Sequence, residues 1–171
     1  IHAVQDTIIS KWWGLAAKHH LGRGLEQGID WAVSCKQVVS LRKKGDSKAV
    51  AIHETILCSA CWSPARVAAC YPSASADCPM CGEQYCDALH TYWTGPKLAD
   101  YEGQQIKDTQ RLVDKAVDEH VTVPCLWLRG LLPAALATPD NYSPPSDTIM
   151  LFVLGWSQQV EWPAGHYGTD A

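Results

Sequence analysis

The segment from Cys78 to His90 constrains this chain most, because it concentrates four potential metal ligands in a short stretch. It runs CPMCGEQYCDALH, so Cys78 and Cys81 are separated by two residues and are followed by Gly82. A turn of this kind directs two sulfur atoms at one ion. Cys86 and His90 are four residues apart, a spacing that would place both on one face of a helix. The spacing therefore predicts that Cys78, Cys81, Cys86 and His90 bind one metal ion.

Zinc is the ion that this mixture of thiolate and imidazole ligands favours. Four protein ligands would complete a tetrahedron and leave no position for water, so the ion would be structural. Two C-x2-C pairs among the eight cysteines are more typical of metal binding than of a disulfide framework. We therefore expect a zinc knuckle at residues 78–96, in an intracellular protein of a reducing compartment. Disulfide bonds, or a metal-free loop of reduced thiols, are the alternatives.

A second C-x2-C pair, Cys58 and Cys61, offers another ligand set. It precedes the first pair by a spacing that fits a four-cysteine zinc ribbon. The pair also lies in a strongly apolar helical pattern, where a free cysteine behaves as a small buried hydrophobic residue. We favour burial for this pair, and also for Cys35, Cys70 and Cys125. The spacing leaves open whether the second pair replaces the last two ligands of the first set.

Hydrophobic residues recur at helical spacing through most of residues 1–137. The pattern predicts helices over Val4 to His20, Leu25 to Lys44, Pro64 to Ala69 and Asp108 to His120. It also predicts a helix that is capped by Asp46 or Ser47 and ends at Trp62. Ser63 followed by Pro64 is typical of a helix start, because proline is preorganised for the first helical position. We therefore predict a mainly α fold, in which a helical domain contains the small zinc knuckle.

The composition changes at residues 138–147, where TPDNYSPPSD is typical of a linker. The stretches that follow, TIMLFVLGW, QQVEW and HYGTDA, are typical of short strands. The sequence thus predicts two parts. Residues 1–137 form the helical domain, and residues 138–171 form a linker with a few short C-terminal strands.

The charge balance limits the partners that the chain can attract. A net charge of -4 and a pI of about 5.9 give no general attraction to nucleic acid. A local patch for such contact would have to use the basic run Arg42 to Lys44 and the pair Trp12 and Trp13. We favour a solvated helix end as the explanation of the basic run. No apolar stretch approaches the roughly 18 residues that a membrane helix needs, so we expect no membrane insertion.

The cysteine segment resembles part of a known family, the region after the polymerase core in reverse transcriptases of non-LTR retrotransposons, especially the long polyproteins of protist genomes. In that family a zinc-binding segment runs C-x2-C-G, then an acidic loop, then His, four residues and Cys-Pro. The C-x2-C-G segment and His90 of this chain match it. The family's last cysteine falls on Gly95, just before Pro96, so Cys86 would have to replace it as a ligand.

Other segments carry the same resemblance. WSPAR at residues 62–66 resembles the W-x-P-A-R segment before the family's zinc motif, and PCLWLRGLLP at residues 124–133 resembles a recurrent segment after it. HYGTDA at residues 166–171 is similar to the first strand of a ribonuclease H domain. The resemblance implies that Asp170 corresponds to the first metal-binding carboxylate of that domain.

A complete active site is absent from the sequence. Reverse transcription requires a paired-aspartate turn that holds two metal ions, and the chain contains no Asp-Asp pair. Asp170 alone cannot support ribonuclease H chemistry. The resemblance therefore implies a nonenzymatic accessory module that connects polymerase and ribonuclease H parts of a retroelement polyprotein, with nucleic acid as a candidate partner. The alternative hypothesis is a structural subunit of a larger protein assembly, in which tryptophan-rich helices pack against other proteins.

Overall fold

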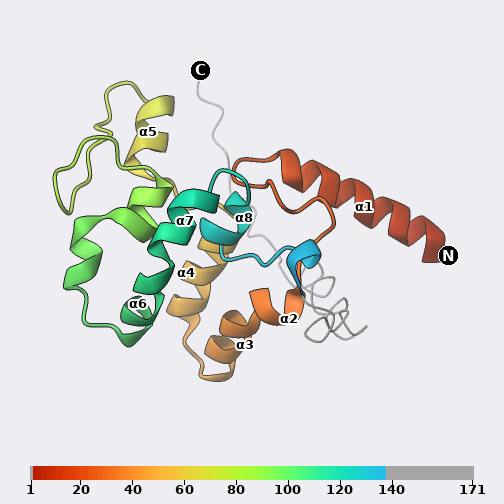
Figure 1. The fold of residues 1–171 in the computed structure, drawn as a ribbon. Coiled ribbons are helices and arrows are strands. Elements are labelled where there is room, and N and C mark those ends of the chain that lie inside the picture. The colour runs from red at the N-terminus through yellow and green to blue at the C-terminus, as the bar shows by residue number, and fades with distance from the viewer. Residues whose placement is uncertain (1, 138–171) are drawn as a thin grey trace, which may run out of the picture.

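The computed structural model describes residues 2–137, whose regular structure is helical (Figure 1). The α-helices are α1 (His2–Lys18), α2 (Trp31–Ser34), α3 (Lys36–Lys43), α4 (Ser47–Leu57), α5 (Pro64–Cys70), α6 (Gln104–Thr109), α7 (Val113–Glu119) and α8 (Pro124–Trp127). Single turns of other helical types are η1 (His90–Thr94), η2 (Pro96–Asp100), η3 (Gln110–Leu112) and η4 (Ala134–Leu136). The prediction of a mainly α fold is confirmed for these residues. The predicted linker and C-terminal strands, with Asp170, lie outside them.

The core joins the first part of the chain to the last part of the described region. Its buried cluster consists of Leu25, Ile29, Cys125 and Leu131, and partly buried residues including Trp13 pack around it. Burial raises the pKa of the Cys125 thiol to about 11, because a thiolate would lose its hydration there. The core is therefore made from residues about a hundred positions apart in the sequence.

The single helix predicted for Leu25 to Lys44 is wrong. Successive turns lead to Ile29, which pairs with Pro133 in an isolated antiparallel bridge. The Asp30 amide donates to the carbonyl of Leu132 at 2.9 Å, and only then does α2 begin. The Asp30 carboxylate caps α2 by accepting from the Val33 amide at 3.0 Å. Hydrogen bonds to the distant 131–134 segment thus replace the local helical bonds that the periodicity predicted.

The predicted first helix is present as α1, and its outward face is apolar. Ile8, Trp12 and Leu15 are exposed, with 65% of Trp12 accessible. Trp13 instead packs against the core and stacks obliquely on Trp31, with ring centroids 5.9 Å apart. Of the tryptophan pair that nucleic-acid contact would have to use, Trp12 is therefore exposed and Trp13 is packed against the core. None of the described helices is long and apolar enough to cross a membrane.

Local capping signals place the starts of α4 and α5 where the sequence predicted them. The Asp46 carboxylate accepts from the Ala49 amide at 3.0 Å, and the Ser63 hydroxyl caps α5 with Pro64 at the first turn. An ion pair between Arg42 and Glu54 joins α3 to α4. Helix α4 ends at Leu57, earlier than the predicted end at Trp62.

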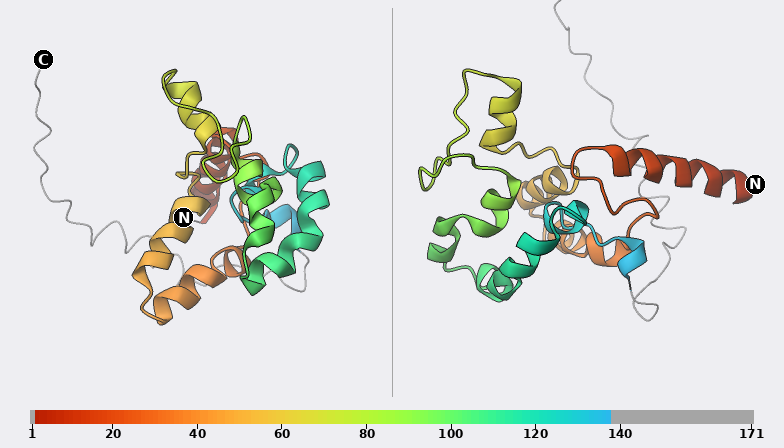
Figure 2. Two further views of the ribbon diagram at one scale, coloured as in Figure 1. Left: turned by 90° about the vertical axis from the view of Figure 1, so that its left-hand side faces the viewer. Right: turned by 45° about the horizontal axis from the view of Figure 1, so that its top comes forward.

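The helix predicted for residues 108–120 is divided in the structure. Helix α6 ends at Thr109, the η3 turn follows, and α7 runs from Val113 to Glu119. In Figures 1 and 2, α5 and the loop after it stand at one side of the molecule, while α1 projects from the other side. The cysteine segment therefore lies at the edge of the helical body and away from its buried cluster.

Candidate metal centre

The backbone of the C-x2-C segment closes a tight loop. The Gly82 amide donates to the Cys78 carbonyl at 2.8 Å, and the Cys78 amide donates to the Glu83 carbonyl at 2.8 Å. Gly82 adopts a φ of 74°, in the left-handed region that a residue with a side chain enters at a cost. The glycine after the second cysteine therefore lets the chain reverse while both cysteine side chains stay on the same side.

A second set of backbone contacts holds Cys86. Its amide donates to the Ala76 carbonyl at 2.7 Å, and its carbonyl accepts from the Ala65 amide at 3.0 Å, which ties it to the first turn of α5. The Asp87 carboxylate then accepts from the His90 amide at 2.8 Å and caps the turn that follows. Cys86 thus precedes this cap, so the prediction that it shares a helix face with His90 is wrong.

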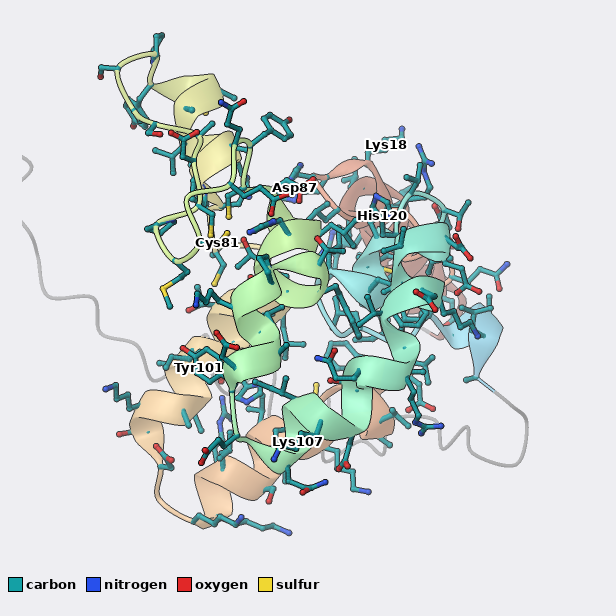
Figure 3. The ribbon with its side chains drawn as sticks, turned by 60° about the vertical axis from the view of Figure 1, so that its left-hand side comes forward. Lys18, Cys81, Asp87, Tyr101, Lys107 and His120 are labelled. Atoms are coloured by element: carbon teal, nitrogen blue, oxygen red, sulfur yellow. The ribbon has the colours of Figure 1, made fainter. Side chains whose placement is uncertain are left out.

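Three of the four predicted ligands converge. The ligand atoms of Cys78, Cys81 and His90 all lie within 4.8 Å of one another, and sulfur atoms lie close together beside Cys81 in Figure 3. The Cys81 Sγ and the His90 Nε2 are 3.4 Å apart. A tetrahedral zinc ion, with bonds of about 2.3 Å to sulfur and about 2.0 Å to nitrogen, separates such atoms by about 3.5 Å. The spacing of the two atoms therefore fits one shared ion.

Cys86 lies beside this group rather than inside it. Its side chain is buried, and its Sγ is 3.6 Å from the Thr91 hydroxyl oxygen. Burial raises the pKa of this thiol, and interaction with the Cys78 side chain raises it further. Cys86 is thus a third thiol in contact with the converging group, in the position from which a fourth ligand could come.

Backbone N–H groups favour the ionised form of Cys78. The pKa of this thiol is lowered to about 6, because the Met80 amide donates to its sulfur and the Cys81 amide adds a second hydrogen bond. The pKa of Cys81 is raised instead. The Glu83 amide lowers it, but burial and the neighbouring Cys78 sulfur outweigh that effect. One thiolate is therefore available at neutral pH before any metal binds.

A carboxylate lies near the far side of the His90 ring. His90 Nδ1 lies 3.5 Å from the Glu83 Oε2, while Nε2 faces the cysteines. Histidines that bind zinc commonly donate their other ring N–H to a carboxylate, which fixes the tautomer and strengthens the ligand. The sequence analysis did not identify Glu83 or Asp87 as part of the site. Asp87, three residues before His90, is recognisable from its sequence position as a cap.

Gly95 lies against the same histidine. A Cβ atom at this position would be 3.4 Å from the His90 Nε2, so residue 95 borders the site. The same Cβ would also be 2.8 Å from the His90 carbonyl oxygen, too close without a backbone shift. A ligand side chain at residue 95, where the resembled family has its last cysteine, therefore does not fit this backbone.

The other cysteines are placed apart from the converging group. Cys58 and Cys61 are exposed, so the prediction that they are buried is wrong, and neither belongs to a cluster of three potential ligands in residues 2–137. Tyr92 has a pKa raised to about 12 by burial and by a hydrogen bond with Cys61. Cys125 is buried as predicted and Cys35 is half-buried, but Cys70 is exposed, so the prediction that it is buried is wrong. All eight cysteines fall within the described residues, and none forms a disulfide.

Comparison of the chain with protein-family models, with curated proteins and with solved structures finds no match. The chemistry of the converging side chains is therefore the ground on which a function can be argued. Two cysteines and a histidine, with a further thiol in contact, favour a soft or borderline divalent cation over magnesium or calcium, which prefer oxygen ligands.

Proposed function

We propose that this chain is a nonenzymatic module stabilised by one structural zinc ion, with Cys78, Cys81, Cys86 and His90 as its ligands. The 3.4 Å separation of the Cys81 Sγ and the His90 Nε2 carries the proposal, because it suits two ligands of one tetrahedral ion. A small movement of the Cys86 side chain from Thr91 towards Cys78 would complete the set. Four protein ligands would leave no position for a reacting water, so the ion would stabilise the fold rather than catalyse a reaction.

The proposed ion would join two parts of the chain. Cys86 is bonded to the start of α5, and His90 begins η1, which contacts α7. A zinc ion between them would fix how the helices before the cysteine segment sit against those after it. This suits a connector between larger parts, the role that the resemblance to the post-polymerase region of retroelement polyproteins implies.

Elemental analysis of the purified chain tests the ligand set. We expect one zinc ion per chain in the unaltered protein, and loss of most of it in Cys86→Ser. Cys58→Ser is the matched control, because it removes an exposed thiol of the other C-x2-C pair and should leave the zinc content unchanged. An undiminished zinc content in Cys86→Ser would show that the fourth ligand lies elsewhere, and loss in Cys58→Ser would assign that role to the second pair.

The alternative function, a structural subunit of a protein assembly, is favoured by the outward face of α1. Large apolar side chains exposed side by side, here Ile8, Trp12 and Leu15, often mark a protein interface. Comigration with stable protein partners, without nucleic acid, supports the subunit. Retention of template nucleic acid that is released steeply with salt supports the connector.

A further inference from the structure

A cleft of about 530 Å³ lies at the end of α1, away from the cysteine segment. One wall is formed by residues 17–19 and 21–23, and the other by residues that follow α7. Four basic side chains line it, namely Lys18, His19, Arg23 and His120. Figure 3 shows Lys18 and His120 on the same side of the molecule, although about a hundred residues separate them in the sequence.

The two walls are fixed to each other by the fold. Arg23 Nη1 donates to the Val121 carbonyl at 2.9 Å, and the Cys125 amide donates to the Arg23 carbonyl at 3.4 Å. Cys125 and Leu128 behind the cleft are buried. The cleft is therefore preformed, and a ligand that enters it does not have to order either wall.

Among the described residues, the basic side chains that line this cleft form no ion pair with a carboxylate. No acidic side chain lines the cleft. Among the described residues, Arg23 and the neighbouring Arg66 and Arg129 donate to backbone carbonyls, and none of the three forms an ion pair with a carboxylate. The pKa of His20, next to the cleft, is lowered by burial and by the positive charges of Arg66, His19 and Arg129. This region is therefore locally positive in a chain whose net charge is negative.

We propose that this cleft binds a phosphate group. A guanidinium, an ammonium and two imidazoles can all donate to phosphate oxygens, and such charge-assisted bonds are the strong ones. The cleft volume falls in the range of about 300 to 1,000 Å³ of small-ligand sites, so it has room for the groups attached to the phosphate. One source of the phosphate is a single-stranded nucleic acid, and this part of the proposal rests on the proposed function of a connector in a retroelement polyprotein. The other source is a small phosphorylated molecule.

Two probes separate these sources: inorganic pyrophosphate and a single-stranded oligoribonucleotide, each titrated into the full zinc-loaded chain. Lys18→Gln and His120→Gln remove cleft contacts and leave in place the Arg23 bond that joins the walls. We expect each variant to weaken binding of a probe by about tenfold, the usual effect of losing one charged hydrogen bond. Lys107→Gln is the matched control, because Lys107 is exposed on α6 at the opposite end of the view in Figure 3.

Each outcome decides one point. Weakened pyrophosphate binding in Lys18→Gln but not in Lys107→Gln supports the cleft as a phosphate site, and the same pattern for the oligoribonucleotide identifies nucleic acid as the source. Pyrophosphate binding that depends on Lys18, without oligoribonucleotide binding, identifies a small phosphorylated ligand. Binding of the oligoribonucleotide that is equal in Lys18→Gln and the unaltered chain overturns the cleft but retains the nucleic-acid contact. Absence of binding by both probes overturns the proposal.

Zinc content and thermal unfolding of each variant are measured alongside the titrations. Equal zinc content separates failure of the cleft from failure of the zinc proposal, since the metal centre is made from other residues. Lys18 is exposed, so its substitution should leave the unfolding temperature unchanged. A weakening in His120→Gln counts only when Lys18→Gln shows it as well, because His120 Nδ1 also contacts the Val117 carbonyl at 2.7 Å.

Discussion

Gly24 has a backbone conformation and a packing environment that both require the absence of a side chain. Its φ is 102°, in the region that favours glycine, and it passes directly over the buried Cys125. A Cβ atom at this position would lie 2.6 Å from the Cys125 Sγ and 3.1 Å from a methyl carbon of Val123. Gly45 has a φ of 74° but no atom within 4 Å of the same point. A side chain would therefore strain the backbone at both glycines, but it would overlap with core atoms only at Gly24.

Gly24→Ala should destabilise the protein more than Gly45→Ala. The left-handed conformation costs about 1 kcal/mol at either site, and overpacking against Cys125 adds about 1 to 3 kcal/mol at Gly24 alone. Chemical denaturation of the two variants and the unaltered chain gives the difference in the free energy of unfolding. Equal losses in both variants would show that the core accommodates a methyl group beside Cys125.

The site also depends on single positions that ligand spacing does not reveal. The spacing in the sequence selected Cys78, Cys81 and His90, which the structure brings together. It did not show that the Asp87 carboxylate accepts from the His90 amide and caps the turn that follows. Cys86 therefore lies before the helical turn and not on it. A ligand pattern specifies which atoms can bind a metal, whereas the caps and turns between them determine the directions of those atoms.

Among the helices, α1 shows how an apolar stripe can mislead. The stripe that defines it as amphipathic includes Ile8, Trp12 and Leu15, which face outward, whereas Trp13 on the opposite side packs into the core. Helical periodicity identifies an apolar face but not the surface that covers it. The packing of Trp13 against Trp31 and the core sets the orientation of this helix.

Substitution of the two adjacent tryptophans tests this orientation. Trp13→Ala should lower the free energy of unfolding by about 3 kcal/mol, because it leaves a cavity beside the core. Trp12→Ala should change it by less than about 0.5 kcal/mol, because Trp12 is mainly exposed. Urea denaturation followed by circular dichroism measures both values. A larger loss for Trp12→Ala than for Trp13→Ala would reverse the assignment of the two faces.

The described part of the molecule combines a buried core with a cysteine segment at its edge. The buried cluster around Leu25 and Cys125 uses hydrophobic contacts and the bond between the Asp30 amide and the Leu132 carbonyl. The cysteine segment at its edge has few buried apolar side chains besides its ligands. If zinc stabilises that segment, removal of the metal should loosen it without unfolding the core.

Hydrogen exchange with and without a strong zinc chelator measures this difference. Amides in residues 71–95 should exchange faster after chelation, whereas the amides of Asp30 and Leu131, which bond to carbonyls in the core, should remain protected. Cys86→Ser should reproduce the chelated pattern without chelator. Unchanged exchange in residues 71–95 would contradict a structural metal, and faster exchange throughout the chain would show that the core also depends on it.

The sequence alone was sufficient for the features that depend on neighbouring residues. Helical periodicity indicated the fold class, Asp46 and Ser63 marked two helix starts, and the C-x2-C segment with its following glycine indicated a tight loop that carries two thiols. Each of these signals acts through hydrogen bonds or turns that span three or four residues. The chain carries such local information whatever its tertiary environment.

Tertiary packing decided the features that depend on distant residues. The break at Leu25 to Lys44 follows from bonds to residues about a hundred positions away, and the exposure of Cys58 and Cys61 follows from the early end of α4. The two walls of the basic cleft are joined by the bond from the Arg23 side chain to the Val121 carbonyl. Such contacts form only when the whole core closes, because a local sequence pattern contains no information about which distant surface will meet it.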